Sequence, residues 1–143
     1  MTVAAILSEK GRDVVTVSGS NTLADICSKL AERRIGAVVI VDDSKHVLGI
    51  LSERDIVRVV AASGAAALQS AASDAMTRQV VTCSSEDTIA TLMTKMTQGK
   101  FRHLPVVENG KLVGIVSIGD VVKRRIAEAE FEARAMRDYI ATG

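Results

Sequence analysis

The chain contains one short pattern twice, first as Gly49-Ile50-Leu51-Ser52-Glu53-Arg54-Asp55 and later as Gly114-Ile115-Val116-Ser117-Ile118-Gly119-Asp120. Each copy is an apolar run that ends in a serine, and an aspartate follows three residues later. A recurrence of this kind indicates a duplicated structural unit, which would account for both halves of the chain.

The match between the two halves extends well upstream of this pattern. Val14-Val15-Thr16-Val17-Ser18 matches Val80-Val81-Thr82-Cys83-Ser84, and Thr22-Leu23-Ala24 matches Thr88-Ile89-Ala90. We therefore expect five segments: a lead-in at 1–13, a first repeat at 14–61, a linker at 62–79, a second repeat at 80–127 and a C-terminal amphipathic helix at 128–143.

Each repeat shows the same order of predicted elements. Short β-branched runs at 14–17 and 80–83 predict strands, and an apolar stripe at i, i+3, i+4 and i+7 predicts a helix after each. The stripe residues are Leu23, Ile26, Cys27 and Leu30 in one copy and Ile89, Leu92, Met93 and Met96 in the other. Two strands joined by a turn follow, at 37–41 and 47–51 and again at 104–107 and 112–116, and a second helix begins near each aspartate.

A β-α-β-β-α unit of this length is too small to bury both faces of its sheet alone. We therefore predict an α+β fold in which the two repeats pack together with pseudo-two-fold symmetry. Cys27 and Cys83 lie far apart in apolar surroundings, which predicts buried free thiols.

Composition narrows the possible functions. The 143 residues are 48% hydrophobic and 24% charged, and the net charge is +1, so no global field attracts nucleic acid. No signal peptide and no apolar run long enough to span a membrane is visible, and we expect a cytoplasmic protein. The chain has no P-loop, no G-x-G-x-x-G motif and no nucleophile with a nearby base, so we expect no enzymatic activity and no catalytic cofactor or metal site.

The ordered repeat, with its GAVVIV or RHLPVV strand and its GILSERD or GIVSIGD motif, resembles a tandem pair of CBS domains, the Bateman module. The opening Ile6-Leu7-Ser8-Glu9-Lys10-Gly11 resembles small stand-alone bacterial members of that family. The resemblance implies regulatory binding of an adenosyl ligand, AMP or NAD(H) above all, or else ADP, ATP or S-adenosylmethionine. It also implies a disc-shaped homodimer of four CBS repeats that signals to an effector protein, which the sequence does not identify.

The repeated motif has chemistry that suits such a ligand. A carboxylate at a strand-to-helix junction can accept hydrogen bonds from both ribose hydroxyls, a role for Asp55 and Asp120. Ser52 and Ser117 can bind a phosphate or the sugar, and the following helix N-terminus favours an anion. The same S-x-x-D pattern is also typical of a capping box, and the two roles are compatible.

Two apolar slots are expected to hold adenine, each with backbone groups at its edge. One would be formed by Val15, Thr16, Ile50 and the stretch Gly36, Ala37 and Val38, and the other by Val81, Thr82, Ile115 and the stretch Arg102, His103 and Leu104. Arg54 in the first motif and Arg102 before the other slot would give each cleft its own phosphate-binding cation.

Three further interpretations remain open in the sequence. Lys10 is either a solvated turn residue or a phosphate contact, and His103 lacks the partners of a catalytic base. The last helix, with Ala129, Ala133, Met136 and Ile140 on one face, packs either on its own module or on a partner. The main functional hypothesis is an adenine-nucleotide sensor with a ligand site between the repeats; the alternative is a dimerisation module of the same fold that needs no ligand.

Overall fold

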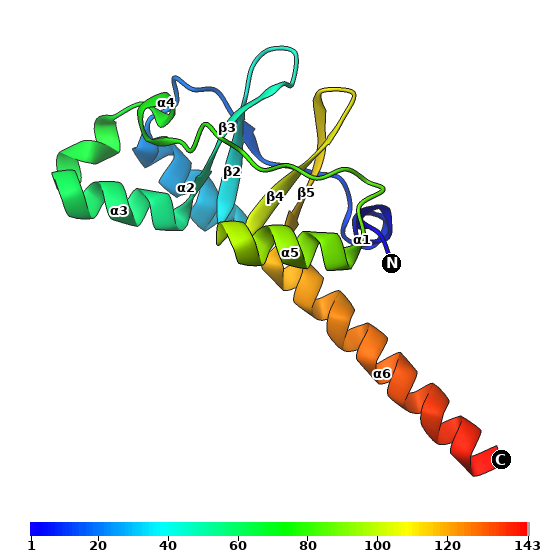
Figure 1. Ribbon diagram of the computed structural model, residues 1–143. Helices are drawn as coiled ribbons and strands as arrows, with labels where there is room; N and C mark the ends of the chain where they lie inside the picture. The colour runs from blue at the N-terminus through cyan, green and yellow to red at the C-terminus, as the bar shows by residue number, and fades with distance from the viewer. Residues whose placement is uncertain (143) are drawn as a thin grey trace.

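The computed structural model describes residues 1–142 and contains two small sheets, with helices packed around them and one long helix that projects from the module (Figure 1). The fold is α+β and consists of two repeats packed with pseudo-two-fold symmetry, as predicted. The first half comprises α1 (Val3–Lys10), β1 (Thr16–Val17), α2 (Leu23–Arg33), β2 (Ala37–Val41), β3 (Val47–Ser52) and α3 (Glu53–Ser63). The second comprises the 3-10 helix η1 (Ala65–Gln69), α4 (Ala72–Ala75), α5 (Ile89–Gly99), β4 (His103–Glu108), β5 (Lys111–Ser117) and α6 (Ile118–Thr142).

The two hairpins have matching registers, which fixes the correspondence between the repeats. β2 and β3 are antiparallel with Ala37 opposite Ser52, and β4 and β5 are antiparallel with His103 opposite Ser117. The turn at Asn109-Gly110 has φ values of 52° and 77°, the left-handed conformation that a two-residue hairpin requires. Ala37 and His103 are therefore equivalent positions, each facing the serine of its own motif.

One predicted strand does not form. In the first repeat β1 runs parallel to β2, and the N–H of Val39 donates to the carbonyl of Val15 at 3.2 Å. The position equivalent to Val39 is Pro105, which has no N–H to donate. The expected strand at 80–83 is consequently reduced to a single parallel bridge between Cys83 and Val106, so this prediction was wrong in extent.

The predicted apolar stripes of α2 and α5 face the two cores with two exceptions. Leu23, Ile26 and Leu30 are buried in α2, while Cys27 is only half-buried against the same core. In α5 Met93 is exposed, because it faces a groove between α5 and α6 and not the core. Burial raises the pKa of the Cys83 thiol to about 11, so that residue is an inert core side chain.

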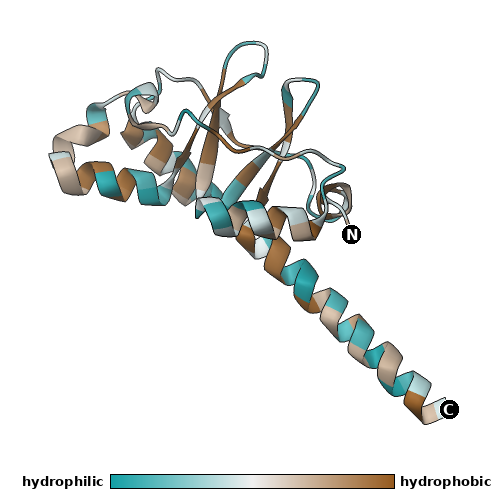
Figure 2. Cartoon of the chain, in the orientation of Figure 1, coloured by the Kyte–Doolittle hydropathy of each residue, from teal (hydrophilic) through white to brown (hydrophobic). Residues whose placement is uncertain are grey.

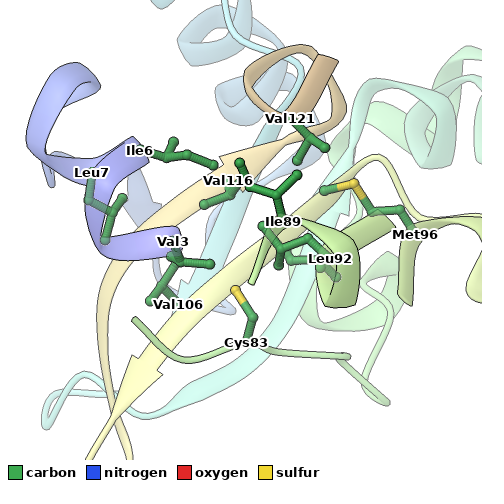
Figure 3. Packing of buried hydrophobic residues seen from close by; sticks show 11 residues of the cluster. Val3, Ile6, Leu7, Cys83, Ile89, Leu92, Met96, Val106, Val116 and Val121 are labelled. Atoms are coloured by element: carbon green, nitrogen blue, oxygen red, sulfur yellow. The ribbon is translucent and has the colours of Figure 1, made fainter. Parts of the chain in front are cut away.

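The helices that precede the repeats are exchanged between them. Val3, Ile6 and Leu7 of α1 pack in the core of the second repeat, where Figure 3 shows them near Val106 and Val116. The segment that holds η1 and α4 packs instead on the core of the first repeat, through Leu68, Ala72, Ala75 and Met76. Equivalent backbone hydrogen bonds dock the two helices: Val3 N–H donates to Asp87 O at 2.9 Å, and Ala72 N–H donates to Asn21 O at 2.7 Å.

The last helix crosses the expected boundary at 127/128 without a break. Near its start Val121 is buried against the second repeat, but every residue from 129 to 142 is exposed. Figure 2 shows brown, hydrophobic residues along this projecting part. Within residues 1–142, no helix combines the length and the apolar character needed to cross a bilayer.

Candidate functional site: two clefts between the repeats

Each repeat begins its last helix with the same serine–aspartate pair. The N–H and the hydroxyl of Ser52 donate to Asp55 Oδ2 at 2.9 and 3.0 Å, and Asp55 N–H donates back to Ser52 Oγ at 3.3 Å. Ser117 and Asp120 form the same three bonds at 2.8, 3.0 and 3.2 Å. The capping interpretation of the motif is therefore confirmed in both repeats.

These capping bonds restrict what the motif can offer a ligand. The hydroxyl proton of Ser52 is already donated to Asp55, so Ser52 Oγ can still accept but has no proton for an ionised phosphate. The first three residues of α3 are Glu53, Arg54 and Asp55. Glu53 N–H donates to Gly36 O at 2.9 Å and Asp55 N–H donates to Ser52, so only the N–H of Arg54 is left for a ligand among these three. Asp55 Oδ1 has no hydrogen-bond partner within residues 1–142 and is free to accept from a ribose hydroxyl.

The first cleft is a pocket of about 230 Å³ beside Asp55. Its basic side chains come from both repeats and are Arg54, Arg58, Lys100 and Arg102. Across the described chain none of the four forms an ion pair, whereas the acidic lining consists of Glu53 and Asp55. The cleft therefore has an excess of uncommitted positive charge next to one free carboxylate oxygen.

The second cleft is already occupied by a side chain of the protein. Lys10 Nζ lies 2.7 Å from Asp120 Oδ2 and donates to the carbonyl of Ile115 at 3.0 Å. Burial tends to raise the pKa of Asp120, but the hydrogen bonds from Lys10 and from the Ser117 N–H outweigh it, and the pKa lies below 3.8. Lys10 is thus not a solvated turn residue: it ends α1 and is paired with the second motif, and its ammonium group retains a third N–H donor.

In the first cleft the carbonyl equivalent to that of Ile115 belongs to Ile50, and it accepts a hydrogen bond from a backbone N–H. Ile50 N–H donates to Thr77 O at 3.1 Å, and Thr77 N–H donates to Ile50 O at 2.9 Å. Both backbone groups of Ile50 are therefore hydrogen-bonded to Thr77, although backbone groups at the edge of this slot were expected to contact adenine. Thr77 itself joins the lining of the pocket.

His103 lies where the two clefts meet. It lines the first cleft and also a neighbouring pocket of about 330 Å³ that contains Lys10 and Ser117. A Cβ on Gly36 would lie 3.2 Å from His103 Cε1, so any other residue here would require the imidazole ring to shift by a few tenths of an ångström. Burial lowers the pKa of His103 below 6.5; Lys10 and Arg102 act in the same direction, and two carboxylates, those of Glu53 and Asp120, oppose them. The imidazole is therefore neutral near pH 7 and in electrostatic contact with both clefts.

The structure groups the predicted residues differently from the two expected slots. Arg102 and His103 were expected beside Ile115. Arg102 instead lines the first cleft with Ile50, Ser52, Arg54, Asp55 and Gly36, whereas His103 lines that cleft and also the neighbouring pocket that contains Ile115. Val15 was expected beside Ile50, but it lines the neighbouring pocket with Ala37, Ile115 and Ser117. Each cleft is consequently built from both repeats, and Arg54 and Arg102 are in one cleft and not in two.

Apart from Asp120, which lies with Lys10 in the second cleft, five predicted residues lie outside these pockets. Val38 and Leu104 are fully buried core side chains, and Thr16 is exposed on β1. Val81 and Thr82 are half-buried, and the carbonyl of Thr82 accepts a hydrogen bond from Lys95 Nζ at 2.9 Å. Their side chains are therefore not assigned to either cleft.

Sequence reasoning missed six lining residues of the first cleft: Glu53, Arg58, Thr77, Gly99, Lys100 and Phe101. Arg58 is one helical turn after Arg54, a spacing that could have been noticed once a helix was predicted there. Phe101 was detectable as one of two phenylalanines in a chain with 2% aromatic residues, and its ring is the only aromatic lining surface of the cleft apart from His103 in the described chain. Among residues 1–142 no cluster of three or more His, Cys, Asp or Glu side chains is arranged to hold a metal ion.

The sequence model of the family described as CBS domain matches the chain twice, over residues 4–62 and 72–127. A crystal structure of a CBS-domain-containing protein from Agrobacterium tumefaciens is 51% identical, with a TM-score of 0.85, and covers 87% of this chain and 99% of its own. The chain therefore belongs to the CBS-domain family and contains a pair of CBS domains.

Two other relatives are also similar to this chain. A CBS-domain protein from Pyrobaculum aerophilum, whose structure is a complex with AMP, is 30% identical with a TM-score of 0.75, over 84% of this chain and 89% of that one. A CBS domain-containing protein of Arabidopsis thaliana is 35% identical over 116 residues, which are 81% of this chain and 22% of the plant protein. The chain thus spans about a fifth of the length of that curated relative.

Proposed function

We propose that this CBS pair is a regulatory, non-catalytic module that binds an adenine nucleotide, and that the first cleft is its main site. The observation that carries the proposal is the set of four unpaired basic side chains around the free Oδ1 of Asp55. A phosphate needs cations, and a ribose needs a carboxylate acceptor; this cleft has both within one pocket.

The bound nucleotide would use three parts of the cleft. Asp55 Oδ1 would accept from the ribose hydroxyls, and the guanidinium groups of Arg54 and Arg102 would bind the phosphate. Phe101 and the apolar side chain of Ile50 would contact the base. The complex of the Pyrobaculum relative with AMP supports an adenosyl ligand as the chemical class.

Isothermal titration of the nucleotide-free protein with AMP, ADP, ATP, NAD, NADH and S-adenosylmethionine tests the function. We expect micromolar binding of at least one nucleotide and weaker binding of S-adenosylmethionine, whose sulfonium end is positively charged like the cleft. Absence of binding throughout the panel would contradict the proposal and favour the dimerisation module that needs no ligand.

A further inference from the structure

The distal part of α6 has no function in either cleft. Residues 128–142 lie beyond the part of the chain that matches the family, and they project from the module (Figure 1). An isolated helical segment of about 15 residues is only marginally stable in water, so contact with a partner would stabilise this segment.

One face of α6 has an apolar residue at alternating intervals of four and three. The positions are Val122, Ile126, Ala129, Ala133, Met136 and Ile140. These intervals are the a and d positions of a heptad repeat, in which a and d residues face a second helix. We call this set the α6 seam.

The seam is open to solvent along most of its length. Val121, which is buried in the second repeat, lies off the seam, whereas Val122 and Ile126 are about half exposed. Farther along, Met136 is 61% and Ile140 is 70% exposed. Near the module the seam is continuous with an apolar groove of about 340 Å³, where α6 lies against Met93 of α5.

The charged residues beside the seam are complementary to those of a second, parallel copy of α6. With Ile126 at an a position, Arg125 and Glu132 occupy g positions, and Glu130 and Arg137 occupy e positions. In a parallel pair of identical helices, each g residue faces the e residue five positions later on the other helix. Arg125 then faces Glu130 of the second copy, and Glu132 faces Arg137 of the second copy, so both contacts are attractive.

An antiparallel pair that overlaps along the whole seam is disfavoured by the same charges. There g faces g and e faces e, and in this register Glu132 lies against Glu132 of the second copy and Glu130 against Glu130. Arg125 already lies 3.2 Å from Glu128 of its own helix, and its guanidinium has donors left for a second carboxylate.

From this spacing and this charge pattern, we propose that the α6 seam pairs with the α6 seam of a second copy of this chain as a short parallel coiled coil. The pairing would hold two modules side by side at the same end of the coil. It does not depend on the proposed nucleotide site, because no seam residue lines either cleft.

Sedimentation equilibrium of the intact chain and two matched variants tests the pairing. Met136→Lys places a charge on the seam, and Phe131→Lys places the same charge on a side chain that is 74% exposed but off the seam. We expect the wild type to dimerise, Met136→Lys to raise the dimer dissociation constant at least tenfold, and Phe131→Lys to leave it unchanged within about twofold. A monomeric wild type, or equal effects of the two variants, overturns the proposal.

A charge exchange tests the orientation. Glu132→Arg should weaken the dimer, because it faces Arg137 of the second copy, and adding Arg137→Glu should restore the wild-type dissociation constant. The two positions are five apart and do not face each other within one helix, so the rescue is a contact between chains. Far-UV circular dichroism of each variant checks that α6 remains helical. A double variant that dimerises no better than Glu132→Arg contradicts the parallel pairing.

Discussion

Asp55 and Asp120 occupy equivalent positions and make the same capping bonds, yet their remaining surroundings differ. Lys10 pairs with Asp120, whereas the described chain has no cation bound to Asp55. The repeated sequence gives no hint of this difference, because Lys10 lies outside both copies of the motif. One side chain before the first repeat thus makes two similar clefts unequal.

We expect Asp55→Ala to weaken AMP binding about 30-fold, because loss of a charged hydrogen bond costs about 2 kcal/mol. Asp25→Ala is the matched control: Asp25 has the same capping role in α2, with Thr22, but lines neither cleft. Titration calorimetry of both variants gives the comparison. Equal affinities of the two variants would refute the ribose contact.

Lys10 and Asp120 should stabilise the fold as an ion pair, since their side chains are only 32% and 23% exposed. Lys10→Met should cost about 1 kcal/mol at pH 7 in the wild type and much less in an Asp120→Asn background. Because the pKa of Asp120 lies below 3.8, this contribution is present above that pH and is lost as the pH falls through the folded-state pKa. Urea unfolding at pH 7 and at pH 3 measures it; an equal cost in both backgrounds would rule out the pair.

His103 should make stability depend on pH just below neutrality. Its pKa in the fold is below 6.5, so the unfolded chain takes up the proton first and stability falls as the pH drops below about 6.5. We expect His103→Asn to reduce this decline between pH 7 and pH 5.5 in thermal unfolding. His46→Gln, which changes the other histidine on an exposed hairpin, should preserve the decline, and a reversed pattern would contradict the assignment.

At the level of elements, most boundaries could be predicted because the hydrophobic period and the turn residues agree in both repeats. The absence of a full strand at 80–83 could not be predicted by matching the repeats. It depends on whether the N–H of residue 105 would have faced the 80–83 segment, as the N–H of Val39 faces Val15 in the first repeat. The exposure of Met93 likewise depends on where α6 packs. Thr77 and Phe101 line the first cleft because of the way the two repeats pack together. No sequence pattern within one repeat predicts that packing.

Gly49 and Gly114 open the two motifs and face different neighbours. A Cβ on Gly49 would meet Met76 and would lie 2.9 Å from the Thr77 carbonyl, a backbone atom that cannot move alone. A Cβ on Gly114 would lie 2.8 Å from a methyl group of Leu7, which can rotate away. We expect Gly49→Ala to cost about 2 kcal/mol and Gly114→Ala less, as measured by urea unfolding. A larger cost at Gly114 would contradict this.

For the whole molecule, the exchange of leading helices is the feature that the sequence least revealed. The lead-in at 1–13 supplies α1 to the core of the second repeat, and the linker supplies α4 to the core of the first. Each half therefore depends on residues that are distant in sequence. The same lead-in brings Lys10 to Asp120, so the exchange also places the Lys10 side chain in the second cleft.

A crystal structure of the chain grown with AMP tests most directly whether the first cleft is the main nucleotide site. We predict AMP in the first cleft, with a ribose hydroxyl within about 3 Å of Asp55 Oδ1 and the phosphate at Arg54 and Arg102. AMP bound only beside Asp120, with Lys10 displaced, would contradict the account.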